Sequence, residues 1–108
     1  MSQLPTPVLA MIDAINAADT DAFVAAFTPA GFVSDWGTVK AGPDGVRGWA
    51  DSDAIGAGAR MTVLSSETEG DTTRIRFGWA SRVFNGESDG IFVVDGDRLA
   101  SFTIPPGH

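Results

Sequence analysis

The sequence contains no cysteine and no tyrosine, and its single histidine is His108. Without cysteine there is no disulfide, no thiolate metal ligand and no cysteine nucleophile, and the chain is compatible with any redox compartment. His108 ends a short Pro-Pro-Gly tail, residues 105–108, where we expect it to be exposed and without a catalytic role. Histidine-dependent catalysis is therefore not expected.

Basic residues and long apolar runs are also scarce. Seven Lys and Arg stand against fourteen Asp and Glu, which gives a formal charge of −7 that repels nucleic acid and anionic membrane surfaces. No apolar run approaches the ~20 residues of a membrane span, and the start, MSQLPTPV, lacks the features of a signal peptide. We expect a cytoplasmic protein with no nucleic-acid or membrane partner.

The length of 108 residues suits one domain, residues 1–108, with a single apolar core. Apolar residues at helical spacing, with proline or capping residues at the starts, predict helices over residues 6–18, 19–27 and 42–51. Residues 55–58 have no periodicity and are expected to form a loop.

The second half of the chain has the pattern of strands separated by turns. Turns are predicted at 69–71, at Asn85-Gly86 and at 95–97. Together with one early strand, the predicted strands are 32–36, 61–66, 74–84, 91–94 and 99–104. Helices followed by hairpins indicate an α+β domain whose helices cover one face of a curved, mainly antiparallel sheet.

Asp35 is the carboxylate with the most distinctive position. In the strand 32–36 it shares a face with Val33, while Phe32, Ser34 and Trp36 occupy the other face. A carboxylate that apolar walls shield from water is a useful general base or acid near neutral pH. The alternative is that Asp35 caps a turn near Gly37 or faces solvent.

The strand 74–84 allows two orientations. Hydrophobicity places one face of this strand inside, namely Ile75, Phe77, Trp79 and Val83. Alignment of Asn85-Gly86 with the hairpin of the family that the chain resembles instead places the other face inside, namely Arg74, Arg76, Gly78, Ala80, Arg82 and Phe84. A bulge near Gly78 would reconcile the two. Without a bulge, the apolar set would form a second buried surface, most plausibly a dimer interface.

The order of these local sequences resembles the nuclear-transport-factor-2-like (NTF2-like) superfamily, which includes SnoaL-like cyclases and ketosteroid isomerase. The resemblance covers roughly residues 6–104 and rests on Ala18-Asp19, Phe23–Phe27, Phe32-Val33-Ser34-Asp35, Gly42–Trp49 and Val94–Leu99. It implies a cone-shaped α+β barrel, with three N-terminal helices packed on a strongly curved sheet. It further implies a mostly apolar pocket open at one end, and a homodimer.

The resemblance carries one catalytic role onto this chain, because Asp35 stands where the isomerase has its general base. The isomerase also needs a tyrosine and a protonated acid, but Met11 and Gly90 stand at those positions, so steroid isomerisation is not expected. Limonene epoxide hydrolase places an arginine between two aspartates, an arrangement that Arg82 would imitate with Asp35 and Asp89 if Arg82 pointed inward.

The expected site therefore has Asp35 as its catalytic residue, without a metal or cofactor. Asp51 and Asp53 are expected to face solvent, and each of the three tryptophans is assigned to a pocket or, alternatively, to core or interface packing. The predicted pocket is lined by Met11, Ile15, Phe27, Trp49, Met61, Arg82, Phe102 and Ile104.

Two functions follow from these residues. One is a SnoaL-like isomerase, cyclase or hydrolase in which Asp35 acts as acid or base on a small uncharged organic molecule. The other is a non-catalytic ligand-binding or dimerisation module whose cone is filled or unreactive.

Overall fold

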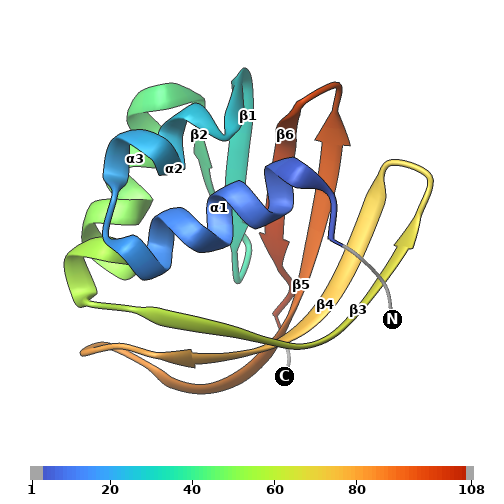
Figure 1. The fold of residues 1–108 in the computed structure, drawn as a ribbon. Coiled ribbons are helices and arrows are strands. Elements are labelled where there is room, and N and C mark those ends of the chain that lie inside the picture. The colour runs from blue at the N-terminus through green and yellow to red at the C-terminus, as the bar shows by residue number, and fades with distance from the viewer. Residues whose placement is uncertain (1–3, 107–108) are drawn as a thin grey trace.

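Three helices cover the concave face of a six-stranded, strongly curved and unclosed sheet (Figure 1). The computed structural model describes residues 4–106, and His108 lies outside this range. The elements in chain order are α1 (Thr6–Ala17), α2 (Thr20–Ala25), β1 (Phe27–Asp35), β2 (Thr38–Ala41), α3 (Gly42–Asp53), the 3₁₀ turn η1 (Ile55–Ala57), β3 (Arg60–Glu69), β4 (Thr72–Ala80), β5 (Asn85–Asp95) and β6 (Arg98–Ile104).

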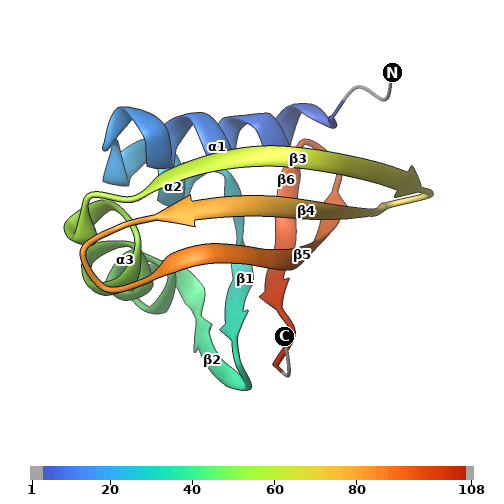
Figure 2. The same ribbon diagram turned by 90° about the horizontal axis from the view of Figure 1, so that it is seen from below.

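The sheet has the strand order β2-β1-β6-β5-β4-β3. Neighbouring strands pair antiparallel except for β1 and β6, which run parallel. The long strands β3 and β4 cross the direction of β1 and β6 at a steep angle, so the sheet bends around α1 (Figure 2). The predicted α+β class and the curved, mainly antiparallel sheet are confirmed.

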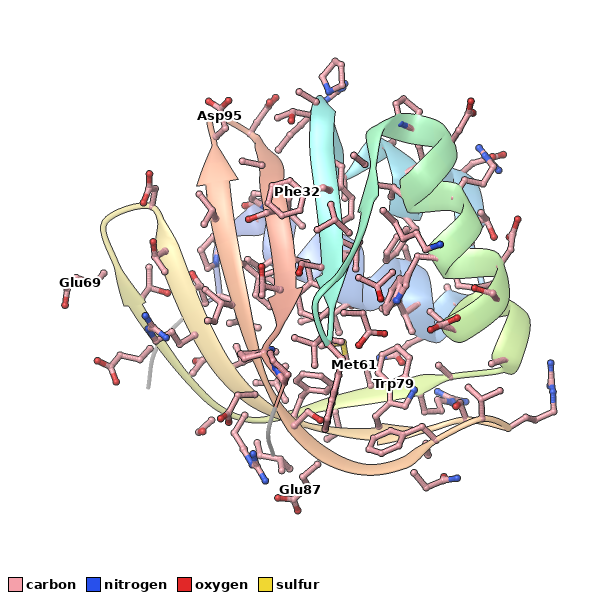
Figure 3. The ribbon with its side chains drawn as sticks, turned by 180° about the vertical axis from the view of Figure 1, so that it is seen from behind. Phe32, Met61, Glu69, Trp79, Glu87 and Asp95 are labelled. Carbon is pink, nitrogen blue, oxygen red and sulfur yellow. The ribbon has the colours of Figure 1, made fainter. Side chains whose placement is uncertain are left out.

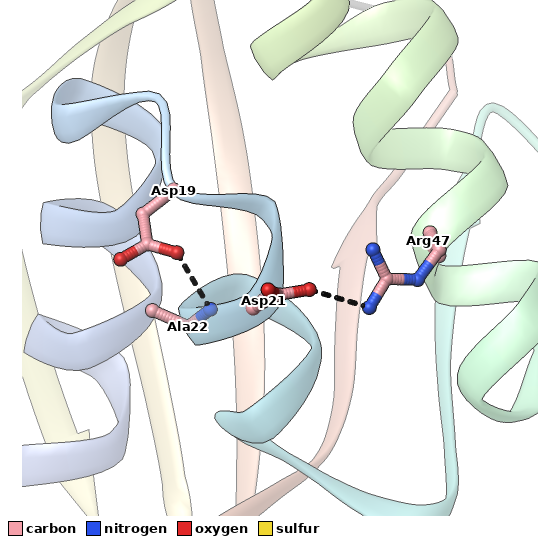
Figure 4. A network of polar contacts seen from close by, with 4 residues as sticks. All are labelled: Asp19, Asp21, Ala22 and Arg47. Carbon is pink, nitrogen blue, oxygen red and sulfur yellow. Dashed lines mark hydrogen bonds and ion pairs between the residues drawn. The ribbon is translucent and has the colours of Figure 1, made fainter.

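The helices begin largely where the sequence predicts. The Asp19 side chain accepts a hydrogen bond from the Ala22 amide, at 3.0 Å, and so caps α2. Arg47 of α3 donates to Asp21 at 2.8 Å, which links the two helices (Figure 4). No helix within residues 4–106 is long and apolar enough to cross a membrane.

The chain between α2 and α3 differs from the prediction. The helix predicted through Phe27 ends at Ala25, because the Ala26 carbonyl instead accepts from the Leu99 amide, at 2.8 Å, as β1 joins β6. Pro29 is tolerated in β1 because the pairing with β6 is irregular there. Strand β2 was not predicted; its four residues are all exposed, so they carry no alternating apolar pattern.

The β4–β5 hairpin also differs from the prediction. The turn lies at residues 81–84, where the Ser81 hydroxyl accepts from the amides of Val83 and Phe84. Asn85 and Gly86, predicted as the turn, instead belong to β5 and pair with Ala80 and Trp79.

The corrected turn decides which face of β4 lies inside. Ile75, Phe77 and Trp79 are buried. The β3–β4 pairing shifts register close to Gly78, between the Val63–Phe77 and Ser65–Arg76 pairs, but the extra residue is Leu64 of β3, so β4 keeps its alternation. Figure 3 shows Trp79 on the helix side of the sheet and Glu87 on the opposite side. The alternative of a second apolar surface does not hold for these three residues, which are part of the core, whereas Val83, the fourth residue of the apolar set, lies in the turn and is exposed.

The core is a cluster of aromatic rings between α1, α3 and the sheet. The Trp49 ring lies 5.8 Å from Phe23 and 6.1 Å from both Trp79 and Phe102, measured between centroids. Asn16 of α1 both donates to and accepts from the Met61 backbone, at 2.9 and 2.8 Å, and so ties the helix to the edge strand β3.

Gly90 of β5 is a close-packed point in this core. A Cβ atom built there would lie 2.9 Å from the Phe102 ring and 3.1 Å from the Phe77 ring. The rings thus leave no room for a larger side chain at Gly90, the position at which the resemblance implies the isomerase's protonated acid.

We expect Gly90→Ala to lower the free energy of unfolding by about 1–3 kcal/mol, because it overpacks the core. Gly78→Ala is the matched control, since its Cβ would meet only one atom, at 4.0 Å. The control should leave stability unchanged or raise it slightly, because alanine is favoured over glycine in a strand. Equal denaturation midpoints for the two variants would contradict this packing argument.

Candidate functional site

Asp35 is the last residue of β1 and points to the helix side of the sheet. It pairs with Ile104 of β6, as its face-mate Val33 pairs with Phe102, which confirms the predicted face. The chain then reverses through Trp36 and Gly37, both with positive φ, into β2. The Trp36 amide donates to the Ile104 carbonyl at 3.0 Å, so the β1 end is held firmly in the sheet.

The Asp35 carboxylate is oriented by Trp49. The indole Nε1 of Trp49, which lies on α3, donates a hydrogen bond to Oδ2 of Asp35, at the end of β1, at 3.0 Å. The carboxylate is half-buried, and its hydrogen bond goes to the indole rather than to the turn at Gly37. Oδ2 is therefore fixed, while Oδ1 remains available to a ligand.

Asp35 lies in the wall of a cavity of about 390 Å³. Its inner part is made of buried aromatic rings, and its mouth is bordered by the exposed side chains of Trp36, Val83 and Phe84. The complete lining is Asp35, Trp36, Trp49, Asp53, Phe77, Trp79, Val83, Phe84, Ser88 and Ile104.

Three residues of the predicted site meet in this cavity: Asp35, Trp49 and Ile104. Five others are buried in the core and do not line the cavity, because neighbouring helices and aromatic rings pack directly against them. These five are Met11, Ile15, Phe27, Met61 and Phe102.

Arg82 does not reach the cavity. Because the hairpin turns at 81–84, Arg82 leaves the strand, and its guanidinium donates to the Gly56 carbonyl while its amide donates to Ala57. Asp89 forms an ion pair with Arg76 at 3.1 Å, and the hydrogen bond between them raises the pKa of Arg76. The Asp–Arg–Asp arrangement considered from the sequence is therefore not formed.

Two polar residues of the cavity were missed by the sequence analysis. Asp53, predicted to face solvent, lies one helical turn after Trp49, and this i, i+4 spacing was a usable signal. Ser88 is only 6% exposed, and its hydroxyl forms no hydrogen bond to the described residues. Ser88 pairs with Phe77 across the β4–β5 hairpin. Its place in the cavity could therefore be predicted only with the hairpin turn at residues 81–84.

The site therefore offers a carboxylate with one oxygen fixed, a hydroxyl that has no hydrogen-bond partner among residues 4–106, and aromatic walls. Within residues 4–106, no group of three or more Asp, Glu, His or Cys side chains is placed to hold a metal ion. This chemistry suits proton transfer to or from a compact, largely apolar molecule.

Similar proteins are found by comparison of structures and not by comparison of sequences with family models or curated proteins. No protein-family model matches the sequence, and no curated protein does. A proposed polyketide cyclase from Sinorhizobium meliloti is 27% identical, with a TM-score of 0.83 and 94% of each chain covered. An NTF2-like protein of unknown function from Cytophaga hutchinsonii is 14% identical, with a TM-score of 0.78, over 96% of this chain and 92% of that one.

A third similar structure is SalBIII, an epoxide hydrolase/cyclase-like enzyme that acts in pyran ring formation in the polyether salinomycin. It is 16% identical, with a TM-score of 0.81, over 94% of this chain and 88% of that one. The chain thus has the fold of the NTF2-like superfamily, to which SnoaL-like cyclases and ketosteroid isomerase belong, and the resemblance seen in the sequence is confirmed at the level of fold.

The bond between Trp49 and Asp35 can be measured with a double-mutant cycle. We expect Trp49→Phe and Asp35→Leu to show a coupling of about 1 kcal/mol in the free energy of unfolding, since each removes one side of the same hydrogen bond. The control cycle pairs Trp49→Phe with Asp44→Leu, at an exposed position near the start of α3. Similar coupling in both cycles would show that the hydrogen bond contributes nothing specific.

Proposed function

We propose that this protein is a SnoaL-like acid/base enzyme of the isomerase, cyclase or hydrolase type, acting on a small uncharged organic molecule through Asp35. The observation that carries this proposal is the position of Asp35, which lies in a cavity wall with one oxygen fixed by the Trp49 indole. A fixed carboxylate is aligned for proton transfer before the substrate arrives, which lowers the entropic part of the barrier.

The size and lining of the cavity support a compact substrate. About 390 Å³ is near the lower end of the range for small-molecule pockets. Aromatic walls favour an apolar body, while the Ser88 hydroxyl is available to bond one oxygen of the substrate. In this proposal Oδ1 of Asp35 takes or gives the proton, and the Ser88 hydroxyl orients the substrate by a hydrogen bond.

The similar structures support ring-forming or ring-opening chemistry within this range. The Sinorhizobium meliloti protein is described as a proposed polyketide cyclase, and SalBIII acts in pyran ring formation. Both share the overall fold, and the proposal extends their type of reaction to this chain.

Ligand binding without catalysis is the second candidate. It is favoured because the positions of the isomerase's tyrosine and acid are taken by the core residue Met11 and the close-packed Gly90. A filled cone is not part of this candidate, because the cavity is present. Substitution of Asp35 separates the two functions.

Thermal-shift screening of terpenoids, polyketide-like aromatics and steroids would identify a ligand, because binding stabilises the folded state by mass action. With that ligand, we expect Asp35→Asn to bind within about threefold of the original affinity and to lose at least about 100-fold in turnover, the usual contribution of a general acid or base. Asparagine can still accept the Trp49 hydrogen bond. Asp44→Asn should retain full turnover, and unchanged turnover in Asp35→Asn would remove Asp35 from the mechanism.

We further propose that the protein forms a homodimer. The support is the family resemblance alone, since the apolar residues of β4 lie in the core and not on an outer face. Light scattering after size-exclusion chromatography should give twice the chain mass of 11.2 kDa, and a monomer mass at micromolar concentration would contradict the proposal.

A further inference from the structure

The charged groups that line the cavity are all of one sign. Asp35 and Asp53 carry carboxylates, and none of the described lining residues is Lys, Arg or His. Five of the ten lining residues are aromatic: Trp36, Trp49, Phe77, Trp79 and Phe84. Carboxylates and the negative faces of aromatic rings both attract a positive charge.

Arginines on neighbouring elements are engaged outside the cavity. Arg47 pairs with Asp21 of α2, and Arg76 pairs with Glu87 and Asp89. Arg82, next to the cavity-lining Val83, is held at the Gly56 carbonyl. No ion pair with a described cation therefore neutralises Asp35 or Asp53.

Asp53 brings no advantage to its own helix. It is the last residue of α3, whose final turn contains no basic residue, and a carboxylate at the negative end of the helix dipole is unfavourable. Within residues 4–106, its hydrogen-bond partner is the hydroxyl of the adjacent Ser52, which donates at 2.6 Å. The stability of α3 therefore does not account for Asp53, whereas its position in the cavity wall allows its carboxylate to contact a ligand.

We propose that this cavity is selective for positive charge: it binds small organic ammonium ions in preference to neutral molecules of the same shape. The inference rests on the proposed function and deepens it. A neutral substrate would be accepted by the aromatic walls, and a transition state that gains positive charge would be held more tightly than the substrate itself. An enolate, which gains negative charge, would be repelled by the carboxylate of Asp53, since Asp35 itself becomes neutral when it takes the proton.

Selectivity for positive charge narrows the class of reaction that the cavity can catalyse. Ring closure or ring opening in which positive charge builds on carbon fits the cavity, whereas isomerisation through an enolate does not. Ser88 remains available to bond a neutral oxygen of the same molecule.

Three molecules of nearly identical shape test the charge preference: choline, the neutral 3,3-dimethylbutan-1-ol and the anionic 3,3-dimethylbutanoate. Titration followed by tryptophan fluorescence or calorimetry should show choline binding about tenfold more tightly than the alcohol, the factor expected for a partly desolvated cation on aromatic rings. The butanoate should bind more weakly than the alcohol. Equal affinities for choline and the alcohol, or no binding of choline at millimolar concentration, would overturn the inference.

Asp53→Asn is the informative variant and Asp51→Asn its matched control. Both remove one negative charge from the end of α3, and only Asp53 lines the cavity. We expect Asp53→Asn to weaken choline binding about fivefold with the alcohol unaffected, and Asp51→Asn to change neither. Equal effects of the two variants on choline would assign the preference to the net charge of the protein and overturn the inference.

The outcomes separate this inference from the proposed function. If the alcohol binds as well as choline, the charge preference fails while Asp35 can still act as acid or base. If Asp35→Asn retains full turnover, the catalytic proposal fails whatever the choline result. The charge preference is measured by binding alone, so it does not depend on knowing the substrate.

Discussion

The hydrogen bond from the Trp49 indole to Asp35 is the constraint on which both the core and the site depend. The indole is almost completely buried and packs against three other aromatic rings, so its N–H needs a partner inside the protein. Asp35 supplies the acceptor, and in return its carboxylate is fixed at the cavity wall. The packing requirement of the core thus positions the one acid that the family resemblance marks as reactive.

Much of the fold could be predicted because local patterns and long-range packing agree. The amphipathic helix α1, the Asp19 cap of α2, the proline near the start of α3 and the turn at Gly96 all follow from short-range rules. The face of Asp35 was predicted because strand residues alternate strictly, and Val33 identifies the buried side.

The errors have two origins, one in a local turn and one in long-range packing. Asn85-Gly86 has strong turn propensity, yet the turn forms at residues 81–84, where the Ser81 hydroxyl accepts two backbone hydrogen bonds. Because the turn was predicted too late in the chain, Arg82 was wrongly placed in the pocket and Ser88 was not predicted to line it. Hydrophobicity had identified the inner face of β4 correctly, and the family alignment of the hairpin was the weaker guide. The five predicted pocket residues in the core were misplaced because no local pattern tells how far the helices and aromatic rings fill the cone.

The mouth of the cavity is built from two hairpin tips, Trp36 on one side and Val83 with Phe84 on the other. Their side chains are exposed, while the rings beneath them belong to the core. Substitutions at the tips therefore cost little stability, whereas substitutions deeper inside disturb the whole domain. The entrance therefore tolerates substitution better than the interior, so the shape of the cavity mouth can change while the core and the Trp49–Asp35 hydrogen bond are kept.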